Sequence, residues 1–306
     1  MNVPAVGSLP AFKVELRKPE GLAPNEVRLR PGTPLFVMAD THGEFEIAVA
    51  LLKQQHVIDS NLRWAFGKGH LAILGDVFDR GPNQTEILWL LYKLEGEAAA
   101  AGGGVHLVLG NHEALTLSGD TRYLNPKYEQ VRAVLNAPTY AALWNERTLL
   151  GRWLRNKASV LKLGRFLCLH GGISRGAVDR KLTLAQMNGA IRAALDTAHP
   201  DSFIMSDVGP LWYRGYFPEM AREGGYAAAT SDDVDATLAF YGVKSVFVGH
   251  TTVPIVTPLF AGRVVAVQVY PHRDEASGKP VMEGLLVKQG RFYRARVDGK
   301  VELLTP

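Results

Sequence analysis

The stretch LAILGDVFDRGPNQTEIL, residues 71–88, passes from an apolar run through a charged loop into a helical pattern. Its first four residues are typical of a buried strand, and its last six begin a segment with helical spacing. Between them the chain places Asp76, Asp79 and Arg80 within five positions, with glycines on either side. A solvated surface loop would explain these charges. So would a site that holds a cation and an anion together.

The same alternation of strand and helix continues on both sides of this stretch. Strands are predicted at 34–40, 70–76, 105–111, 165–172 and 243–251, with helices at 43–55 and 83–102. Strands that alternate with helices predict parallel pairing through crossover helices, and therefore an α/β fold. Three later segments are rich in β-forming residues, and the last two suggest a closing hairpin: 263–270, 283–290 and 291–299.

The chain divides into an arm and a single large domain. Residues 1–33 are rich in Pro and Gly and predict an extended N-terminal arm, and residues 34–306 predict one catalytic domain. Residues 114–160 hold helical and aromatic segments without a strand, which predicts a helical insertion beside the site. A further helix is expected at 183–195.

Composition excludes several classes of protein. The net charge of +4 comes from 34 basic and 30 acidic residues that are scattered along the chain, so nucleic acid is not an expected partner. No apolar run approaches the roughly 20 residues of a membrane span. Cys168 is the only cysteine and lies in an apolar run, which favours a buried strand residue over a reactive thiol. One thiol fits the cytoplasm, which we favour, and a periplasmic location stays open if a leader has been removed.

Polar side chains follow five of the apolar runs, at the point where each run ends. Because parallel strands point their carboxyl ends the same way, residues at those ends converge on one crevice. Singly, each would more simply be a turn residue, a helix cap or a hydrogen-bonded histidine. Together they predict a metal site whose candidate ligands are Asp40, His42, Asp76, Asn111, His170 and His250.

The ligand types indicate which metals are expected. Carboxylate, amide oxygen and imidazole together suit Mn, Fe and Zn, with Mn favoured, and suit Mg less well. Six ligand residues are too many for one tetrahedral ion with an open position. They fit two divalent ions about 3.5–4 Å apart that share one carboxylate. The expected cofactors are therefore two divalent metal ions per chain.

The motifs DTHG, GDVFDRG, GNHE, HGG and GH, in this order from residue 40 to residue 250, resemble those of the calcineurin-like metallophosphoesterase superfamily. The resemblance is to its phosphoprotein phosphatase branch, and GPLWYRGY at 209–216 resembles the bacterial Shewanella-like phosphatases within it. This resemblance implies two β-sheets packed face to face as a sandwich and flanked by helices. It also implies a phosphoric ester hydrolase.

The resemblance further assigns a role to each residue. Asp40, His42 and Asp76 would hold the first metal, and Asp76 would bridge to a second metal held by Asn111, His170 and His250. His112 would protonate the leaving group and Asp79 would orient it. A hydroxide between the metals would attack phosphorus directly. Arg80 and Arg214, together with Asn111 and His112, would bind the phosphate.

The expected substrates are phosphorylated proteins or small phosphoesters. The chain lacks the SAPNY-like loop of the eukaryotic serine/threonine phosphatases, and AVQVYPHRDEA stands in the comparable place. This difference favours phosphotyrosine. A diadenosine-tetraphosphate hydrolase and a phosphodiesterase or triesterase are alternatives, and a metal-binding scaffold without activity would be expected to lack a ligand or His112. The sequence does not determine the oligomeric state.

Overall fold

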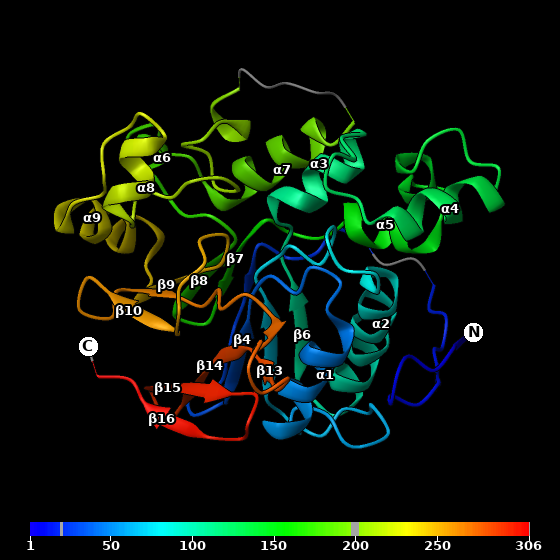
Figure 1. Cartoon of the computed structure of the whole chain (residues 1–306). Coiled ribbons are helices and arrows are strands. Elements are labelled where there is room, and N and C mark those ends of the chain that lie inside the picture. The colour runs from blue at the N-terminus through cyan, green and yellow to red at the C-terminus, as the bar shows by residue number, and fades with distance from the viewer. Residues whose placement is uncertain (19–20, 197–201, 306) are drawn as a thin grey trace.

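Two six-stranded sheets form the centre of the molecule (Figure 1). The computed structural model describes residues 1–18, 21–196 and 202–305. The first sheet has the order β16 (Val301–Leu303), β15 (Arg291–Arg296), β14 (Glu283–Lys288), β4 (Leu35–Met38), β5 (His70–Ile73), β6 (Gly104–Leu107). The second has the order β10 (Thr257–Leu259), β11 (Val264–Ala266), β9 (Ser245–Val248), β8 (Phe166–Leu169), β7 (Val160–Leu163), β3 (Glu26–Val27). Two short pairs complete the β structure: β1 (Asn2–Val3) with β2 (Phe12–Lys13), and β12 (His272–Arg273) with β13 (Pro280–Val281).

The strands pair as the α/β alternation predicts. β4, β5 and β6 are parallel, and so are β8 and β9, whereas β14 and β15 form the predicted hairpin. Phe166 and Phe247 of the second sheet contact Phe292 of the first, with ring centroids 5.8 and 5.5 Å apart. Aromatic contacts of this kind join the inner faces of the two sheets into one core. The predicted two-sheet architecture is confirmed.

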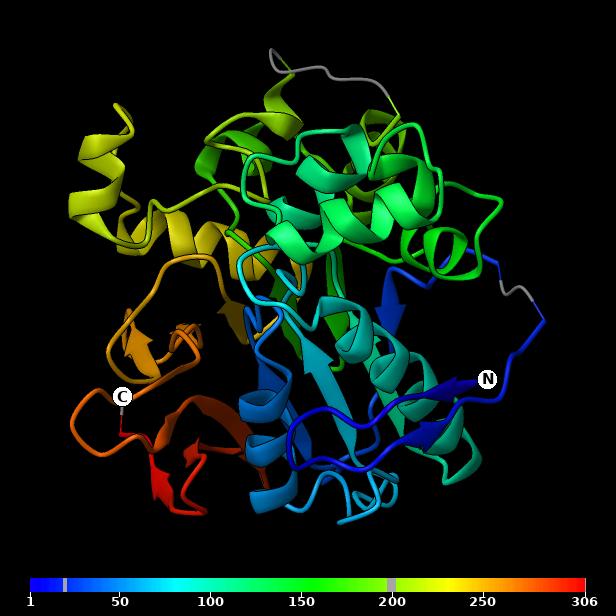
Figure 2. The same cartoon turned by 45° about the vertical axis from the view of Figure 1, so that its right-hand side comes forward.

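Helices lie on the outside of the sheets and at their carboxyl ends. α1 (Phe45–Gln54) and α2 (Gln84–Ala100) lie beside the strands β4 to β6, as Figures 1 and 2 both show. The remaining helices gather where these strands end: α3 (Asn111–Ser118), α4 (Pro126–Val134), η1 (Ala141–Trp144), α5 (Leu149–Arg155), α6 (Arg175–Asp179), α7 (Leu184–Ala194), η2 (Phe203–Met205), α8 (Pro218–Glu223) and α9 (Ser231–Tyr241).

The strands are shorter than the sequence predicts, and the difference positions the site. β5 ends at Ile73 and β6 at Leu107, each about three residues before the end of the predicted run. The apolar residues Leu74 and Leu109 are buried without belonging to the strands. Asn111 therefore begins α3 instead of ending a strand. The candidate ligands stand on loops and helix starts, where side chains can turn toward one another.

The N-terminal segment contributes three short strands to the fold. Residues of the predicted arm form β1, β2 and the edge strand β3, which pairs in parallel with β7. Residues 19–20 lie outside the described part.

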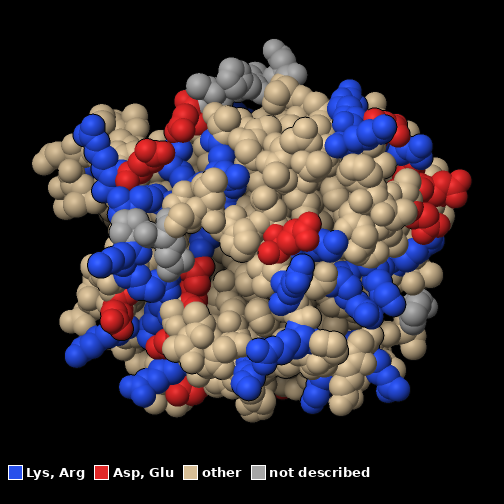
Figure 3. Space-filling view, turned by 180° about the vertical axis from the view of Figure 1, so that it is seen from behind, with Lys and Arg blue, Asp and Glu red and all other residues tan. Residues whose placement is uncertain are grey.

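On the face seen in Figure 3, Lys and Arg are interspersed with acidic and uncharged residues. No helix among the described residues is both long and apolar enough to cross a membrane. Cys168 is fully buried in β8, as predicted.

Candidate metal centre and active site

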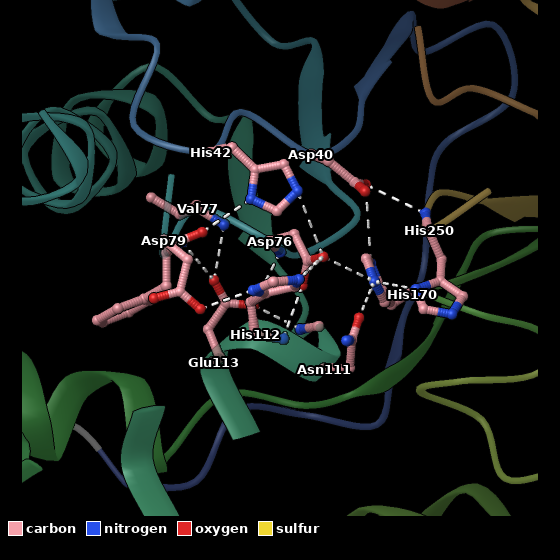
Figure 4. Close-up of polar contacts among 12 residues, drawn as sticks. Asp40, His42, Asp76, Val77, Asp79, Asn111, His112, Glu113, His170 and His250 are labelled. Carbon is pink, nitrogen blue, oxygen red and sulfur yellow. Dashed lines mark hydrogen bonds and ion pairs between the residues drawn. The ribbon is translucent and has the colours of Figure 1, made fainter. Parts of the chain in front are cut away.

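The structure brings all six candidate ligands together at the carboxyl ends of the strands (Figure 4). Asp40 and His42 follow β4, and Asp76 follows β5. Three more arrive from other elements: Asn111 from the first residue of α3, His170 from the end of β8, and His250 from the end of β9. All six are buried, with at most 8% of their surface exposed. Two clusters of possible metal-binding residues share the carboxylate of Asp76: His42, Asp76 and His112 form one, and Asp76, His170 and His250 form the other. The predicted ligands Asp40 and Asn111 lie beside the second cluster, with Asp40 Oδ1 3.8 Å from His170 Nδ1 and Asn111 Oδ1 2.8 Å from His170 Nε2.

His170 lies at the centre of the second cluster. Its Nε2 atom is 2.8 Å from Asn111 Oδ1, 3.1 Å from Asp76 Oδ2 and 3.1 Å from His250 Nδ1. A ring nitrogen carries at most one proton, so it cannot satisfy three such neighbours by hydrogen bonding. A cation placed among these four side chains would accept a lone pair from each of the four atoms. This set of donor atoms therefore fits a metal ion.

The histidine rings are oriented by backbone carbonyls. The Nδ1 atom of His170 is 2.7 Å from the oxygen of Leu74. His42 Nδ1 is 2.9 Å from the oxygen of Phe78, and His250 Nε2 is 3.1 Å from the oxygen of Trp212. Since a carbonyl can only accept, each of these nitrogens donates its proton and the other nitrogen keeps its lone pair for the cluster. This arrangement of the second ring nitrogen is typical of metal-binding histidines.

The charges of the cluster favour a bound cation. Burial, assisted by the charge of Asp76, raises the pKa of Asp40 to about 7. Burial alone would lower the pKa of His170, but the charges of Asp76 and Asp40 outweigh it and raise this pKa to about 9. His42 is affected mainly by burial, which lowers its pKa to about 4. The two carboxylates thus attract positive charge, whether a proton or a metal ion supplies it.

The loop after β5 has a strained backbone. Asp76, Asp79 and Arg80 have φ angles of 53°, 70° and 67°, and His42 and His250 have similar values. Residues with a Cβ adopt this left-handed conformation at a cost, and such residues cluster at functional sites. Neighbouring groups must therefore hold the loop in place.

Glu113 holds this loop in place. It lies in the GNHE motif but was not predicted as a site residue. Its buried carboxylate accepts hydrogen bonds from the backbone N–H groups of Asp76 at 2.8 Å, Val77 at 2.7 Å and Gly110 at 2.6 Å. A Cβ at Gly110 would collide with the carboxylate of Asp76, so only glycine permits this approach. The fixed backbone determines where the Asp76 side chain points.

His112 lies beside the first cluster and is held by Asp79. The Nδ1 atom of His112 is 2.6 Å from Asp79 Oδ2, and its Nε2 is 3.9 Å from Asp76 Oδ2, about as far as His42 Nε2 at 3.8 Å. Burial would lower the pKa of His112, but the hydrogen bond that its ring donates to Asp79 and the charge of Asp76 outweigh burial and raise this pKa. The pairing orients the ring and leaves Nε2 directed toward Asp76.

Arg80 and Arg214 line the same cavity as the ligands, which has a volume of about 770 Å³. The exposed guanidinium of Arg80 lies between two aromatic rings, 5.7 Å from the centre of Tyr123 and 6.0 Å from that of Tyr270. Arg214 Nη1 donates to the oxygen of His250 at 2.8 Å and to Thr251 Oγ1 at 3.0 Å. These two hydrogen bonds hold Arg214 against the segment that carries His250, which is a candidate ligand.

Of the aromatic residues in GPLWYRGY, Tyr213 and Tyr216 are buried and pack against each other. Trp212 lines the cavity. Tyr270 was not predicted as a site residue, although it lies in the stretch noted in place of the SAPNY-like loop.

Comparisons with known proteins agree with this geometry. The profile of the calcineurin-like phosphoesterase family matches residues 33–254. The chain is 25% identical to Shewanella-like protein phosphatase 2 of Arabidopsis thaliana, over 74% of this chain and 68% of that protein. It is 29% identical to Shewanella-like protein phosphatase 1 of Plasmodium berghei, over 72% of this chain and 61% of that protein.

A solved structure is also similar over almost the whole chain. The cold-active protein-tyrosine phosphatase of a psychrophilic Shewanella species superimposes with a TM-score of 0.85 and 36% identity, covering 98% of this chain and 87% of that one. A serine/threonine phosphatase of Saccharomyces cerevisiae has a TM-score of 0.58 and 17% identity, over 90% of this chain and 80% of that one, which shows a shared fold.

Proposed function

The chain belongs to the calcineurin-like phosphoesterase family, and from this premise we propose that it removes phosphate from phosphotyrosine with the help of two divalent metal ions. Membership of the family makes it a metal-dependent phosphoric ester hydrolase. The number and identity of the ions, the roles of the residues and the preferred substrate are parts of the proposal.

One ion would be held by Asp40, His42 and Asp76, and the other by Asp76, Asn111, His170 and His250. The buried clusters support the shared role of Asp76, and they support assigning His42 to one ion and His170 and His250 to the other. Each of these three histidines also donates one ring N–H to a carbonyl. The place of Asp40 at the first ion rests on the family resemblance, since its Oδ1 lies 3.8 Å from His170 Nδ1. We favour Mn because the ligands mix carboxylate, amide and imidazole. When bound, such a pair of ions polarises a phosphoryl group and lowers the pKa of a water molecule toward neutrality.

The remaining site residues act on the substrate. Arg80 and Arg214 bind the phosphoryl oxygens, because a planar guanidinium matches them with paired hydrogen bonds. His112 donates a proton to the oxygen of the leaving group, and Asp79 keeps its ring in the required orientation. General acid catalysis of this kind contributes roughly 10²–10⁴-fold to a rate.

The preference for phosphotyrosine rests on the two tyrosines beside Arg80. The ring of Tyr123 is 5.1 Å from that of His112, and the ring of Tyr270 is 5.8 Å from that of His42. A substrate whose phosphate is bound by Arg80 would place its adjoining group between these rings. A phenyl group can pack on them, whereas the short side chain of serine cannot reach them well. The similarity to a protein-tyrosine phosphatase over nearly the whole chain supports the same preference.

Matched peptides test this preference. Peptides that differ only in phosphotyrosine or phosphoserine are hydrolysed by the Mn-loaded protein, and kcat/KM is compared. We expect phosphotyrosine to be preferred, and the preference to fall several-fold in Tyr123→Leu and Tyr270→Leu. Phe240→Leu is the control, because Phe240 is an exposed aromatic residue of α9 that does not line the cavity.

Equal or better hydrolysis of phosphoserine would contradict the substrate preference and leave the metal and arginine assignments standing. A phosphodiester, a phosphotriester and a dinucleoside tetraphosphate complete the panel. Faster hydrolysis of any of these three would favour the corresponding alternative activity.

A further inference from the structure

The predicted helical insertion contacts the loop that carries Asp79 and Arg80. The backbone oxygen of Arg80 accepts a hydrogen bond from Asn125 Nδ2 at 2.7 Å, and its N–H donates to the oxygen of Tyr123 at 3.0 Å. The insertion therefore holds the backbone of a proposed phosphate-binding residue, in addition to contributing Tyr123 to the mouth of the cavity.

Asp79 is held by a separate chain of buried side chains. The N–H of Asp79 donates to Gln84 Oε1 at 2.7 Å, and Gln84 Nε2 donates to the hydroxyl of Tyr140 at 2.6 Å. Gln84 and Asp79 are fully buried, and Tyr140 is 2% exposed. Since Asp79 also contacts His112 at 2.6 Å, an unbroken series of hydrogen bonds runs from the insertion to the proposed proton donor.

The residue before Asp79 is held by the same part of the insertion. The ring of Trp144 in η1 contacts that of Phe78 at 4.7 Å and that of Tyr140 at 5.9 Å. Asp79 itself has a φ of 70°, which is unfavourable for a residue with a Cβ. Such a conformation persists only where surrounding contacts determine it, and here these contacts are a hydrogen bond on Asp79 and packing on Phe78.

We propose that Gln84 and Tyr140 are positioning residues, which orient Asp79 and through it the ring of His112. Neither residue contacts the ligand cluster, and both lie outside the residues that line the cavity. The role of the insertion is thus to fix the direction in which His112 presents its proton. This inference rests on the proposed function of His112.

The test compares two substrates whose leaving groups differ in their need for a proton. Wild type, Tyr140→Phe and Gln84→Met, all loaded with Mn, hydrolyse phenyl phosphate and p-nitrophenyl phosphate. A misplaced proton donor harms the poorer leaving group more. We expect kcat for phenyl phosphate to fall about tenfold, as for other residues that orient an active-site group. For p-nitrophenyl phosphate we expect a fall of less than about threefold, with KM and metal content unchanged.

Tyr128→Phe is the matched control. Tyr128 belongs to the same aromatic cluster, 5.6 Å from Tyr140. Its hydroxyl donates to the oxygen of Pro82 and accepts from the N–H of Thr85, whereas the side chain of Gln84 donates to Tyr140. Loss of the Tyr128 hydroxyl should leave the ratio of the two rates unchanged. The inference is overturned if Tyr140→Phe and Gln84→Met alter that ratio no more than Tyr128→Phe does. Equal losses for both substrates in His112→Asn would instead overturn the proposed proton donor.

Discussion

Histidines from neighbouring elements lie close together at both ends of strand β5, and the two ends behave differently. At the amino end of β5, His70 Nδ1 is 2.8 Å from Nε2 of His106, the third residue of β6, and the two rings are stacked. At the carboxyl end, His112 and His170 lie beside Asp76. In the part of the chain that the structure describes, groups of three or more candidate metal ligands occur at the carboxyl end alone.

The pKa values show why the ends differ. Burial lowers the pKa of His70, and burial together with the charge of His70 lowers that of His106 to about 3. At the carboxyl end burial acts in the same direction, but carboxylates outweigh it and raise the pKa of His112 and His170. Close histidines therefore do not make a cation site by themselves. The carboxylates that arrive from neighbouring strands make it one.

Removal of the shared carboxylate should have the largest effect. Asp76→Asn leaves the size of the side chain nearly unchanged but removes the charge that both clusters use. We expect kcat/KM to fall at least about a thousandfold, because both ions would be weakened. Elemental analysis after saturation and desalting should find fewer than two equivalents of metal.

Asp207→Asn is the control for this change. Asp207 is an exposed carboxylate that lines the same cavity, and it belongs to neither cluster. This variant should retain two equivalents of metal. If Asp76→Asn also retains two equivalents, the clusters do not share a ligand and the comparison of the two ends loses its basis.

Substitution of His112 sharpens the comparison within the carboxyl end, because His112 lies about as close to Asp76 as the candidate ligand His42 does. His112→Asn should keep both metals and lower kcat by roughly 10²–10⁴-fold for poor leaving groups, as expected for loss of a general acid. Elemental analysis and kcat for two aryl phosphates measure the two effects separately. Loss of one metal equivalent would show that His112 is a ligand.

The smallest effect is expected at the amino end. In the folded protein the pKa of His106 is about 3, whereas the usual value for histidine is 6.5. Below pH 6.5 the unfolded chain therefore binds more protons than the folded protein does. The free energy of unfolding falls as the pH falls through this range. His106→Gln should remove part of this loss, about 1 kcal/mol between pH 7 and pH 5. Urea unfolding of the metal-free protein at both pH values measures it. Metal content and kcat should not change, and a change in either would mean that the two ends are coupled.

Much of the site could be predicted because the ligands lie where apolar runs end. The positions of Asp40, Asp76 and Asn111 follow from strand and helix alternation, and parallel pairing then brings them together. The ends of the strands were predicted too late, because the apolar residues Leu74 and Leu109 are buried beyond the strand pairing. Periodicity reports burial and cannot distinguish a strand from a buried turn.

The sequence by itself determined the fold class, the candidate ligands and the family resemblance, since these depend on residue type and order along the chain. The tertiary structure alone decided what holds the ligands. The contacts that do so join residues 35 to 96 positions apart: they are the carbonyls that orient the histidines, the carboxylate of Glu113 on the loop after β5, and the hydrogen bond between Gln84 and Tyr140. Two contacts are local, that of Glu113 with Gly110 and that of Gln84 with Asp79. Any residue can offer a backbone carbonyl, so no pattern of residue types marks it. Its role depends on where the folded chain places it.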